Sequence, residues 1–207
     1  MTTWDSYAGL TPVGRAGPPP LFSWTPFPGH GPGSETLGID AGSTVLELGC
    51  GKGDRLAYLA SLGVRAVGVD ISAVQVAAAT ARWGSAVEVH RADAVHYLQH
   101  RPDSFDAVYS AFGAHWFTDP ELLLPAIRSR LREDGVVTLA HVPPGDDFDS
   151  DTYAPVPDVG PVLRWEGEAT QWANALQRCG FVQPRVVAIP PPVGSRGVRT
   201  VVIRALG

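Results

Sequence analysis

The sequence predicts an α/β fold, a doubly wound, mostly parallel seven-stranded sheet that ends in a C-terminal β-hairpin. Short apolar runs alternate with helical patterns from residue 43 onward. Two β-rich runs joined by a Pro- and Gly-containing loop then close the chain and are suited to pair as a hairpin. A chain of 207 residues is long enough for one sizeable domain of this kind and hardly for two.

Each element has a local signal. Residues 45–48 are an apolar run typical of a buried strand, and the next strand ends at Asp70. Gly63 stops the helix between them, Ser72 caps the helix that follows, and Pro120 suits the first turn of a later helix. The expected strands cover 45–48, 64–70, 86–93 (with a turn), 105–112, 135–142, 182–190 and 198–205, and the expected helices cover 54–62, 73–83, 120–132 and 168–181.

Two stretches depart from the βα alternation. Glycine and proline are dense through residues 17–33 and preclude a long regular element there, yet the aromatic residues among them are too apolar for a solvated tail. Residues 1–42 are therefore expected to form an N-terminal arm or lid, and 43–207 a single domain. Within it, the Pro- and Asp-rich stretch 142–163 is expected to be an insertion.

Composition restricts the partners and the compartment. The formal net charge is −5, Lys52 is the only lysine, and the arginines are scattered, so no basic face is expected to bind nucleic acid. Cys50 and Cys179 match no metal-binding spacing, so we expect no metal and a reduced, cytoplasmic protein. No export signal and no apolar run of membrane-spanning length is found in the sequence.

The stretch "LELGCGKGD" holds glycines at alternate positions, 49, 51 and 53, directly after a predicted strand. A dinucleotide-binding loop requires a third glycine where Asp54 stands, and a phosphate-binding P-loop requires a lysine there. An aspartate at the start of the following helix would also repel a phosphate, whereas it tolerates a cationic ligand. Both phosphate interpretations are disfavoured.

With Glu47 the pattern reads E-x-G-x-G-x-G, and at this point the sequence resembles the class I S-adenosylmethionine (SAM)-dependent methyltransferases, closest to those that act on metabolites and natural products. "VLELGCGKGD" resembles the first motif of that family, "VGVDIS" the second, "RADA" the third and "FDAVYSAFGAHWF" the fourth. The resemblance extends over residues 43 to 205 in element order. With four motifs in order, it implies the Rossmann-like methyltransferase fold, SAM as cofactor and S-adenosylhomocysteine (SAH) as product.

The resemblance also implies the cofactor contacts. Gly49 and Gly51 let the main chain approach the methionine portion, where a β-carbon would collide. Asp70 is placed to accept hydrogen bonds from both ribose hydroxyls, and Glu47 either contacts the cofactor or orients the glycine loop. The expected cofactor-binding residues are Glu47, Gly49, Cys50, Gly51, Asp70, Ile71, Asp93, Ala94 and Ser110.

The acceptor side is less determined, because methyl transfer from a sulfonium needs a general base only when the nucleophile carries a proton. His115, after the fourth strand, and His30, in the arm, are the candidate bases, and for each a packing or turn role is the alternative. The expected acceptor-pocket residues are Trp24, Phe27, Phe112, Trp116 and His141, with Tyr7 and Trp165 as further aromatic candidates and 142–163 as the insertion beside them.

The expected function is methyl transfer to an oxygen or nitrogen atom of a small molecule, a biosynthetic intermediate, with no nucleic acid or membrane as partner and a homodimer left open. Two alternatives share the fold: another use of the sulfonium, such as cyclisation or aminopropyl transfer, and a SAM-binding subunit that supports another protein.

Overall fold

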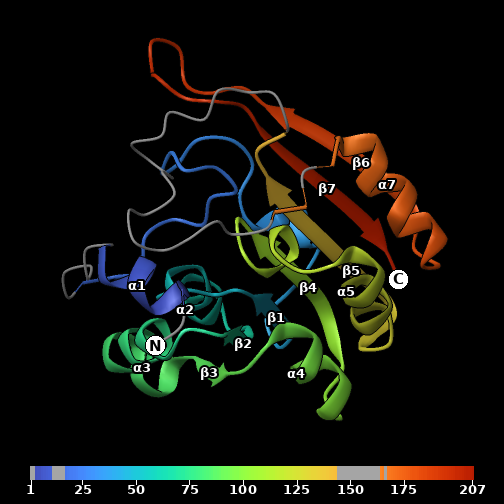
Figure 1. Cartoon of the computed structure of the whole chain (residues 1–207). Helices are drawn as coiled ribbons and strands as arrows, with labels where there is room; N and C mark the ends of the chain where they lie inside the picture. The colour runs from blue at the N-terminus through green and yellow to red at the C-terminus, as the bar shows by residue number, and fades with distance from the viewer. Residues whose placement is uncertain (1–2, 11–16, 144–163, 166) are drawn as a thin grey trace.

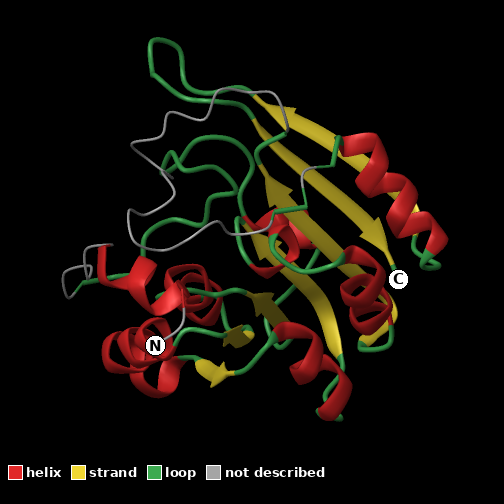
Figure 2. Cartoon of the chain, viewed as in Figure 1, coloured by secondary structure: helices red, strands yellow, loops and turns green. Residues whose placement is uncertain are grey.

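A computed structural model describes residues 3–10, 17–143, 164–165 and 167–207. The elements follow the predicted α/β order (Figures 1 and 2). They are α1 (Thr3–Leu10), η1 (Ser34–Leu37), β1 (Thr44–Leu48), α2 (Asp54–Ser61), β2 (Arg65–Asp70), α3 (Ala73–Trp83), η2 (Gly84–Ala86), β3 (Glu88–Arg91), α4 (Ala94–His100), β4 (Phe105–Ala111), η3 (Ala114–Trp116), α5 (Pro120–Arg128), β5 (Leu131–His141), α7 (Ala169–Arg178), β6 (Val182–Ile189) and β7 (Thr200–Leu206).

The seven strands form one sheet in the order β3-β2-β1-β4-β5-β7-β6. The first five strands in this order run parallel to one another, and β7 runs antiparallel to both β5 and β6. This arrangement confirms the predicted fold class, a mostly parallel sheet closed by a C-terminal hairpin. Its strand order reverses between β1 and β4, the place where open α/β sheets bind ligands.

Two hydrophobic clusters lie on opposite faces of the sheet. One packs α4, α5 and α7 against the strands, and the other packs α2 and part of the N-terminal segment against the opposite face. The layers explain the apolar character of β1 and β4, which are buried along almost their whole length because both of their faces are covered.

The N-terminal segment divides into two parts. Helix α1, which the sequence patterns did not predict, lies beside α3 (Figure 1). Residues 17–33 contain no helix or strand, in agreement with their glycine and proline content. Phe22 and Trp24 nevertheless belong to the second hydrophobic cluster, and the Trp24 indole donates hydrogen bonds to the Gly33 carbonyl (3.0 Å) and to the Thr36 hydroxyl (2.6 Å). The part of the N-terminal segment around Phe22 and Trp24 therefore belongs to the hydrophobic core.

Helix α5 ends at Arg128, four residues earlier than predicted, and β5 begins at Leu131. Leu131 pairs with Phe105, and the register then shifts so that Ala107 pairs with Val136. A turn at residues 129–130 therefore ends the helix, and strand pairing replaces the expected helix at residues 131–132. Helix α4 was not predicted, although Asp93 caps it through a bond from the His96 amide (3.0 Å).

The stretch 142–163, predicted as an insertion, lies almost wholly outside the described residues, which stop at 143 and resume at 164. Among the described helices, none is long and apolar enough to cross a bilayer.

Candidate functional site

A pocket opens at the carboxyl ends of β1, β2 and β4, beside the reversal of strand order. We call it the strand-end pocket. It encloses about 890 Å³ of space, including the part that is open to solvent. Its lining residues are Trp4, Tyr7, Gly49, Gly51, Val69, Asp70, Ile71, Gln75, Ala92, Asp93, Ala94, Phe112, Gly113, Ala114, Phe117 and Thr118.

The glycine loop forms one wall, and two of its glycines are required for different reasons. Gly49 has φ 77°, and a β-carbon there would lie 2.5 Å from the Ala114 backbone nitrogen, so the loop abuts the turn after β4. Gly51 has φ 53°, and a β-carbon there would meet no atom within 4 Å. The main chain at Gly51 thus borders open space that a ligand can fill.

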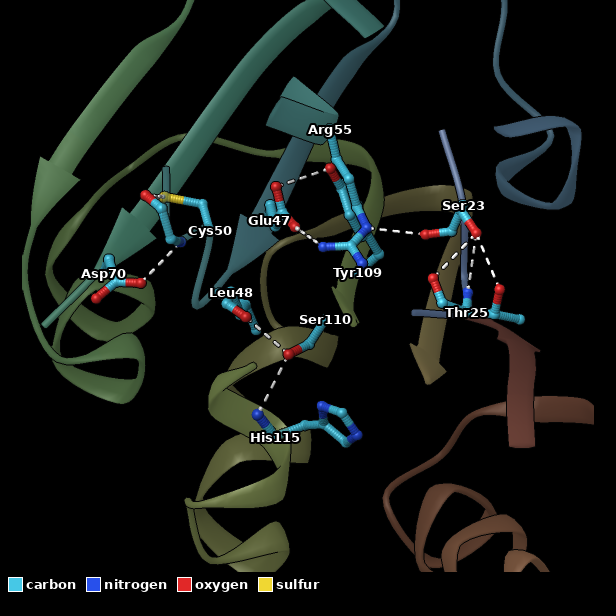
Figure 3. A network of polar contacts seen from close by, with 11 residues as sticks. Ser23, Thr25, Glu47, Leu48, Cys50, Arg55, Asp70, Tyr109, Ser110 and His115 are labelled. Carbon is cyan, nitrogen blue, oxygen red and sulfur yellow. Dashed lines mark hydrogen bonds and ion pairs between the residues drawn. The ribbon is translucent and has the colours of Figure 1, made fainter. Parts of the chain in front are cut away.

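Asp70 stands at the end of β2 with its carboxylate held by the backbone (Figure 3). One oxygen accepts from the Gly51 amide (2.8 Å) and the other from the Ser72 amide (2.9 Å). Burial raises the pKa of the Asp70 carboxyl, while these two donors act to lower it. An ionised carboxylate has about four acceptor sites, so Asp70 keeps acceptor capacity for ligand hydroxyls beside its backbone donors.

Asp93, Ala94 and Ile71 lie along the same wall. The Asp93 side chain caps α4 and also lines the pocket, and Ala94 follows it as the first residue of the helix. Ile71 is 41% exposed at the rim, although it is apolar. These three positions give the wall one carboxylate between apolar surfaces, a combination suited to a nucleobase with an amino group.

Ser110 and Cys50, both predicted cofactor contacts, are not among the lining residues. The Ser110 hydroxyl donates to the Leu48 carbonyl (2.7 Å) and accepts from the His115 amide (3.3 Å), which ties the turn after β4 to β1. Cys50 packs behind the loop, because a β-carbon on Gly68 would lie 2.7 Å from its sulfur. Both residues support the wall from behind.

Glu47 points away from the pocket, into the second hydrophobic cluster (Figure 3). Its carboxylate accepts from the Tyr109 hydroxyl (3.0 Å) and lies 3.7 Å from the Arg55 guanidinium, which donates in turn to the Ser23 carbonyl (2.9 Å). Burial raises the pKa of Glu47 to about 7, against the lowering effect of Arg55. The residue joins β1, β4, α2 and the N-terminal segment, which is a structural role.

His115 and His141 face each other inside the core on the other side of the pocket wall. Their rings approach to 3.3 Å between Nε2 of His115 and Nδ1 of His141, and Trp172 packs on both. Neither lines the pocket, and His115 is fully buried. Burial lowers the pKa of His141 to about 4 and that of His115 well below its usual range, with His141 adding to the effect on His115.

His30 and the predicted acceptor aromatics are distributed elsewhere. The His30 Nε2 lies 2.7 Å from the Pro190 carbonyl oxygen, at the hairpin. Trp24 is buried against Tyr109, and Phe27 lies against Gly197 and near His30. Of the predicted acceptor-pocket residues, Phe112 lines the pocket, whereas Trp24, Phe27, Trp116 and His141 do not.

Helix α1 and the turn before α5 form much of the opposite wall, for which the sequence predicted Tyr7 but not Trp4 or Phe117. Trp4 and Tyr7 reach the pocket from α1, and the ring centroids of Trp4 and Phe117 are 4.5 Å apart. Trp4 and Tyr7 are three residues apart in "WDSYA", a spacing that places both on one helical face once the stretch is known to be helical. Burial raises the pKa of the Tyr7 phenol, so it is neutral near pH 7.

The charge of the pocket is negative. Asp70 and Asp93 line it, and no lysine, arginine or histidine of the described residues does. Within those same residues, no group of three His, Cys, Asp or Glu side chains is placed to hold a metal ion. Backbone amides, two carboxylates and aromatic rings thus form a site for a ligand with hydroxyl groups, an apolar ring and a cationic centre.

SAM fits these features. SAM carries ribose hydroxyls, an adenine ring and a cationic sulfonium. The individual contacts of Gly51, Asp70, Asp93 and Ile71 with the cofactor stay predictions, and all four residues line the pocket.

Residues 45–135 match the family model described as "Methyltransferase domain", a little under half of the chain. No curated protein matches the chain significantly in sequence. The match covers β1 to the middle of β5, and therefore includes the glycine loop, Asp70 and Asp93.

Several solved methyltransferases share the fold. The SAM-dependent methyltransferase of Archaeoglobus fulgidus is 18% identical with a TM-score of 0.63, over 84% of this chain and 89% of that one. Phosphoethanolamine N-methyltransferase 2 of Haemonchus contortus, solved with SAM, is 18% identical with a TM-score of 0.64, over 81% of this chain and 49% of that one. The 1,6-didemethyltoxoflavin-N1-methyltransferase of Burkholderia thailandensis, solved with 1,6-didemethyltoxoflavin and SAH, is 22% identical with a TM-score of 0.61, over 83% and 73%.

Proposed function

We propose that this class I SAM-dependent methyltransferase transfers its methyl group to an oxygen or nitrogen atom of a small, uncharged, ring-containing acceptor. The observation that carries the proposal is the composition of the strand-end pocket. Aromatic rings line the pocket beside the predicted cofactor contacts, and both of its charged side chains are carboxylates.

The aromatic part of the lining comes from three segments of the chain. Trp4 and Tyr7 belong to α1, Phe112 follows β4, and Phe117 precedes α5. Faces of aromatic side chains favour offset or edge contacts with another ring, and each such pair contributes about 0.5–1.5 kcal/mol beyond area burial. A flat acceptor can use several of these contacts at once.

The charge of the pocket selects against anions. An acceptor with a carboxylate or phosphate would meet Asp70 and Asp93 without a cationic side chain from the described residues to pair with it. A neutral phenol, enol or amine avoids this repulsion. The Burkholderia enzyme is named for methylation at a ring position of a small molecule, and biosynthetic intermediates of that kind are the acceptors we propose.

The chain contributes orientation and exclusion of water. SAM supplies an activated methyl group on a sulfonium, so correct alignment of the acceptor can account for up to roughly 7–11 kcal/mol of the barrier. Tyr7, being neutral, can hydrogen-bond the acceptor from the pocket wall. His115 and His30 lie outside the pocket lining, so in this proposal neither takes the acceptor proton.

The experiment measures SAH formation with a panel of matched acceptors. Each neutral ring phenol or amine is paired with the same skeleton carrying a carboxylate, and bulk RNA and a protein extract are included as macromolecular acceptors. We expect acceptor-dependent SAH formation with neutral members, at least tenfold faster in kcat/KM than with their carboxylate partners. Preference for the carboxylate members, or SAH formation only with RNA or protein, would contradict the proposal.

A further inference from the structure

Helix α1 has two buried faces with different partners. Trp4 and Tyr7 share the face that lines the strand-end pocket. Asp5 and Ala8, also three residues apart, are both buried, and α1 packs against α3. A charged side chain such as Asp5, only 7% exposed, is rare in a protein interior unless it is paired. Its surroundings are therefore informative.

The Asp5 carboxylate is bonded to the start of α3. Its Oδ1 accepts a hydrogen bond from the Ser72 hydroxyl at 2.8 Å and lies 3.4 Å from the Val74 amide nitrogen. Ser72 is fully buried and is the residue that caps α3, since its hydroxyl accepts from the Gln75 amide (3.2 Å). The amino end of a helix favours a negative charge, so the contact is stabilising.

The same serine connects Asp5 to the cofactor wall. The Ser72 backbone amide donates to Asp70, whose other oxygen accepts from Gly51. A continuous chain of hydrogen bonds thus runs from α1, through Ser72 and Asp70, to the glycine loop. The charge of Asp5 is near enough to Asp70 to contribute to the raised pKa of that carboxyl, after burial.

At the opposite rim, α1 is held by aromatic contact. The Trp4 ring meets the Phe117 ring edge to face, with centroids 4.5 Å apart and an interplanar angle of 64°. Phe117 itself lines the pocket, after η3. Helix α1 therefore spans the pocket between two attachments, one polar at α3 and one aromatic at the loop before α5.

We propose that Asp5 is a positioning residue that holds α1 across the strand-end pocket through its bond to Ser72, and so keeps Trp4 and Tyr7 over the bound cofactor. Asp5 does not line the pocket and acts through these two rings. The inference concerns retention of cofactor and product, and its test uses no acceptor, so it stands or falls separately from the acceptor proposed above.

The first measurement is SAH binding by the full-length chain, with the dissociation constant from calorimetry and the dissociation rate from tryptophan fluorescence. Hydrogen bonds to charged groups correspond to about tenfold or more in affinity. Asp5→Ala is expected to weaken SAH binding roughly tenfold, mainly through faster dissociation. Asp5→Asn keeps an oxygen that accepts from Ser72, so binding within about threefold of the native chain is expected.

Ser6→Ala is the matched control, because Ser6 lies next to Asp5 on α1 and is only partly buried. It should bind SAH like the native chain. If Asp5→Ala also binds SAH like the native chain, or if Ser6→Ala weakens binding as much, the proposal is overturned.

A double-mutant cycle separates positioning from general stability. If Asp5 acts through the aromatic face of α1, the loss caused by Asp5→Ala should shrink to under about threefold in a Trp4→Ala background. Equal losses in both backgrounds would show that Asp5 does not act through Trp4. A fall in Tm with unchanged SAH affinity, measured well below that Tm, would assign Asp5 a purely structural role and would also overturn the proposal.

Discussion

Strands β2 and β5 end at the same edge of the sheet, and each ends in an ionisable residue, Asp70 and His141. Asp70 borders the strand-end pocket and keeps its charge in contact with backbone amides. His141 is covered by Trp172 and His115 and lies in the core. The end of a strand therefore predicts which edge of a sheet a side chain occupies, whereas the element packed over it decides whether the side chain meets ligand or core.

The first prediction concerns the glycine loop, which borders the strand-end pocket beside Asp70. Gly49→Ala should weaken SAH binding by about 3 kcal/mol or more, because left-handed backbone costs a non-glycine residue about 1–2 kcal/mol and the new methyl would press on the Ala114 backbone. Calorimetric titration measures the loss. Gly84→Ala is a control for the backbone cost alone, since Gly84 has φ 54° and a β-carbon there would meet no atom within 4 Å. Equal losses of SAH affinity in the two variants would contradict a role of the glycine loop in cofactor binding.

The second prediction concerns the strand end that lies in the core, at His141. The pKa of His141 is lowered from 6.5 to about 4 in the folded chain, so the unfolded chain binds more protons between these values. The stability due to a neutral His141 is present above about pH 6.5 and is lost as the pH falls towards 4, by up to about 3 kcal/mol.

Denaturant unfolding from pH 7.5 to 4.5 measures this loss, and His141→Gln should reduce the slope of stability against pH. A slope that His141→Gln does not alter would mean that the ring is solvated in the folded chain.

The contrast explains what the sequence could and could not predict. The glycine loop and Asp70 were predictable because their geometry is local: the loop follows β1 directly, and Asp70 is bonded to Gly51 and Ser72. The mostly parallel sheet and its terminal hairpin followed from the βα alternation and from the two β-rich runs that close the chain. In contrast, the burial of His115 depends on Trp172, which lies far along the chain in α7.

The unpredicted part of the opposite wall has the same origin. Trp4 lines the pocket from α1, which is bonded to Ser72 through Asp5, a contact between residues far apart in sequence. Trp24 appeared suited to an acceptor pocket by its residue type. Its indole N–H instead donates hydrogen bonds to Gly33 and Thr36, and its ring packs on Tyr109. Such packing between residues far apart in sequence cannot be predicted from residue type and spacing alone.

The third prediction returns to Asp70. Asp70→Ala should weaken SAH binding by about 1–3 kcal/mol, because the ribose hydroxyls lose their acceptor and the Gly51 and Ser72 amides lose theirs. Asp103→Ala, which removes a surface carboxylate near Arg65 and Arg101, should not change the affinity. An unchanged SAH affinity in Asp70→Ala would contradict the assignment of the ribose site.

The smallest effect is expected for His115. Because its side chain lies behind the pocket wall, His115→Gln should change kcat by less than about threefold once folding is verified by Tm, with the pH profile of kcat retained. A general base would instead contribute about 10²–10⁴-fold. A loss of that size, with SAH affinity unchanged, would show that the pocket wall opens during turnover.

The most direct test is a crystal structure of the full chain with SAH. The account predicts SAH in the strand-end pocket, with its ribose hydroxyls within hydrogen-bonding distance of Asp70 and with Trp4 or Tyr7 in contact with the ligand. His115 and His141 should remain paired and out of reach of it. SAH bound elsewhere, or in the pocket with an atom hydrogen-bonded to either histidine, would contradict the division between the two strand ends.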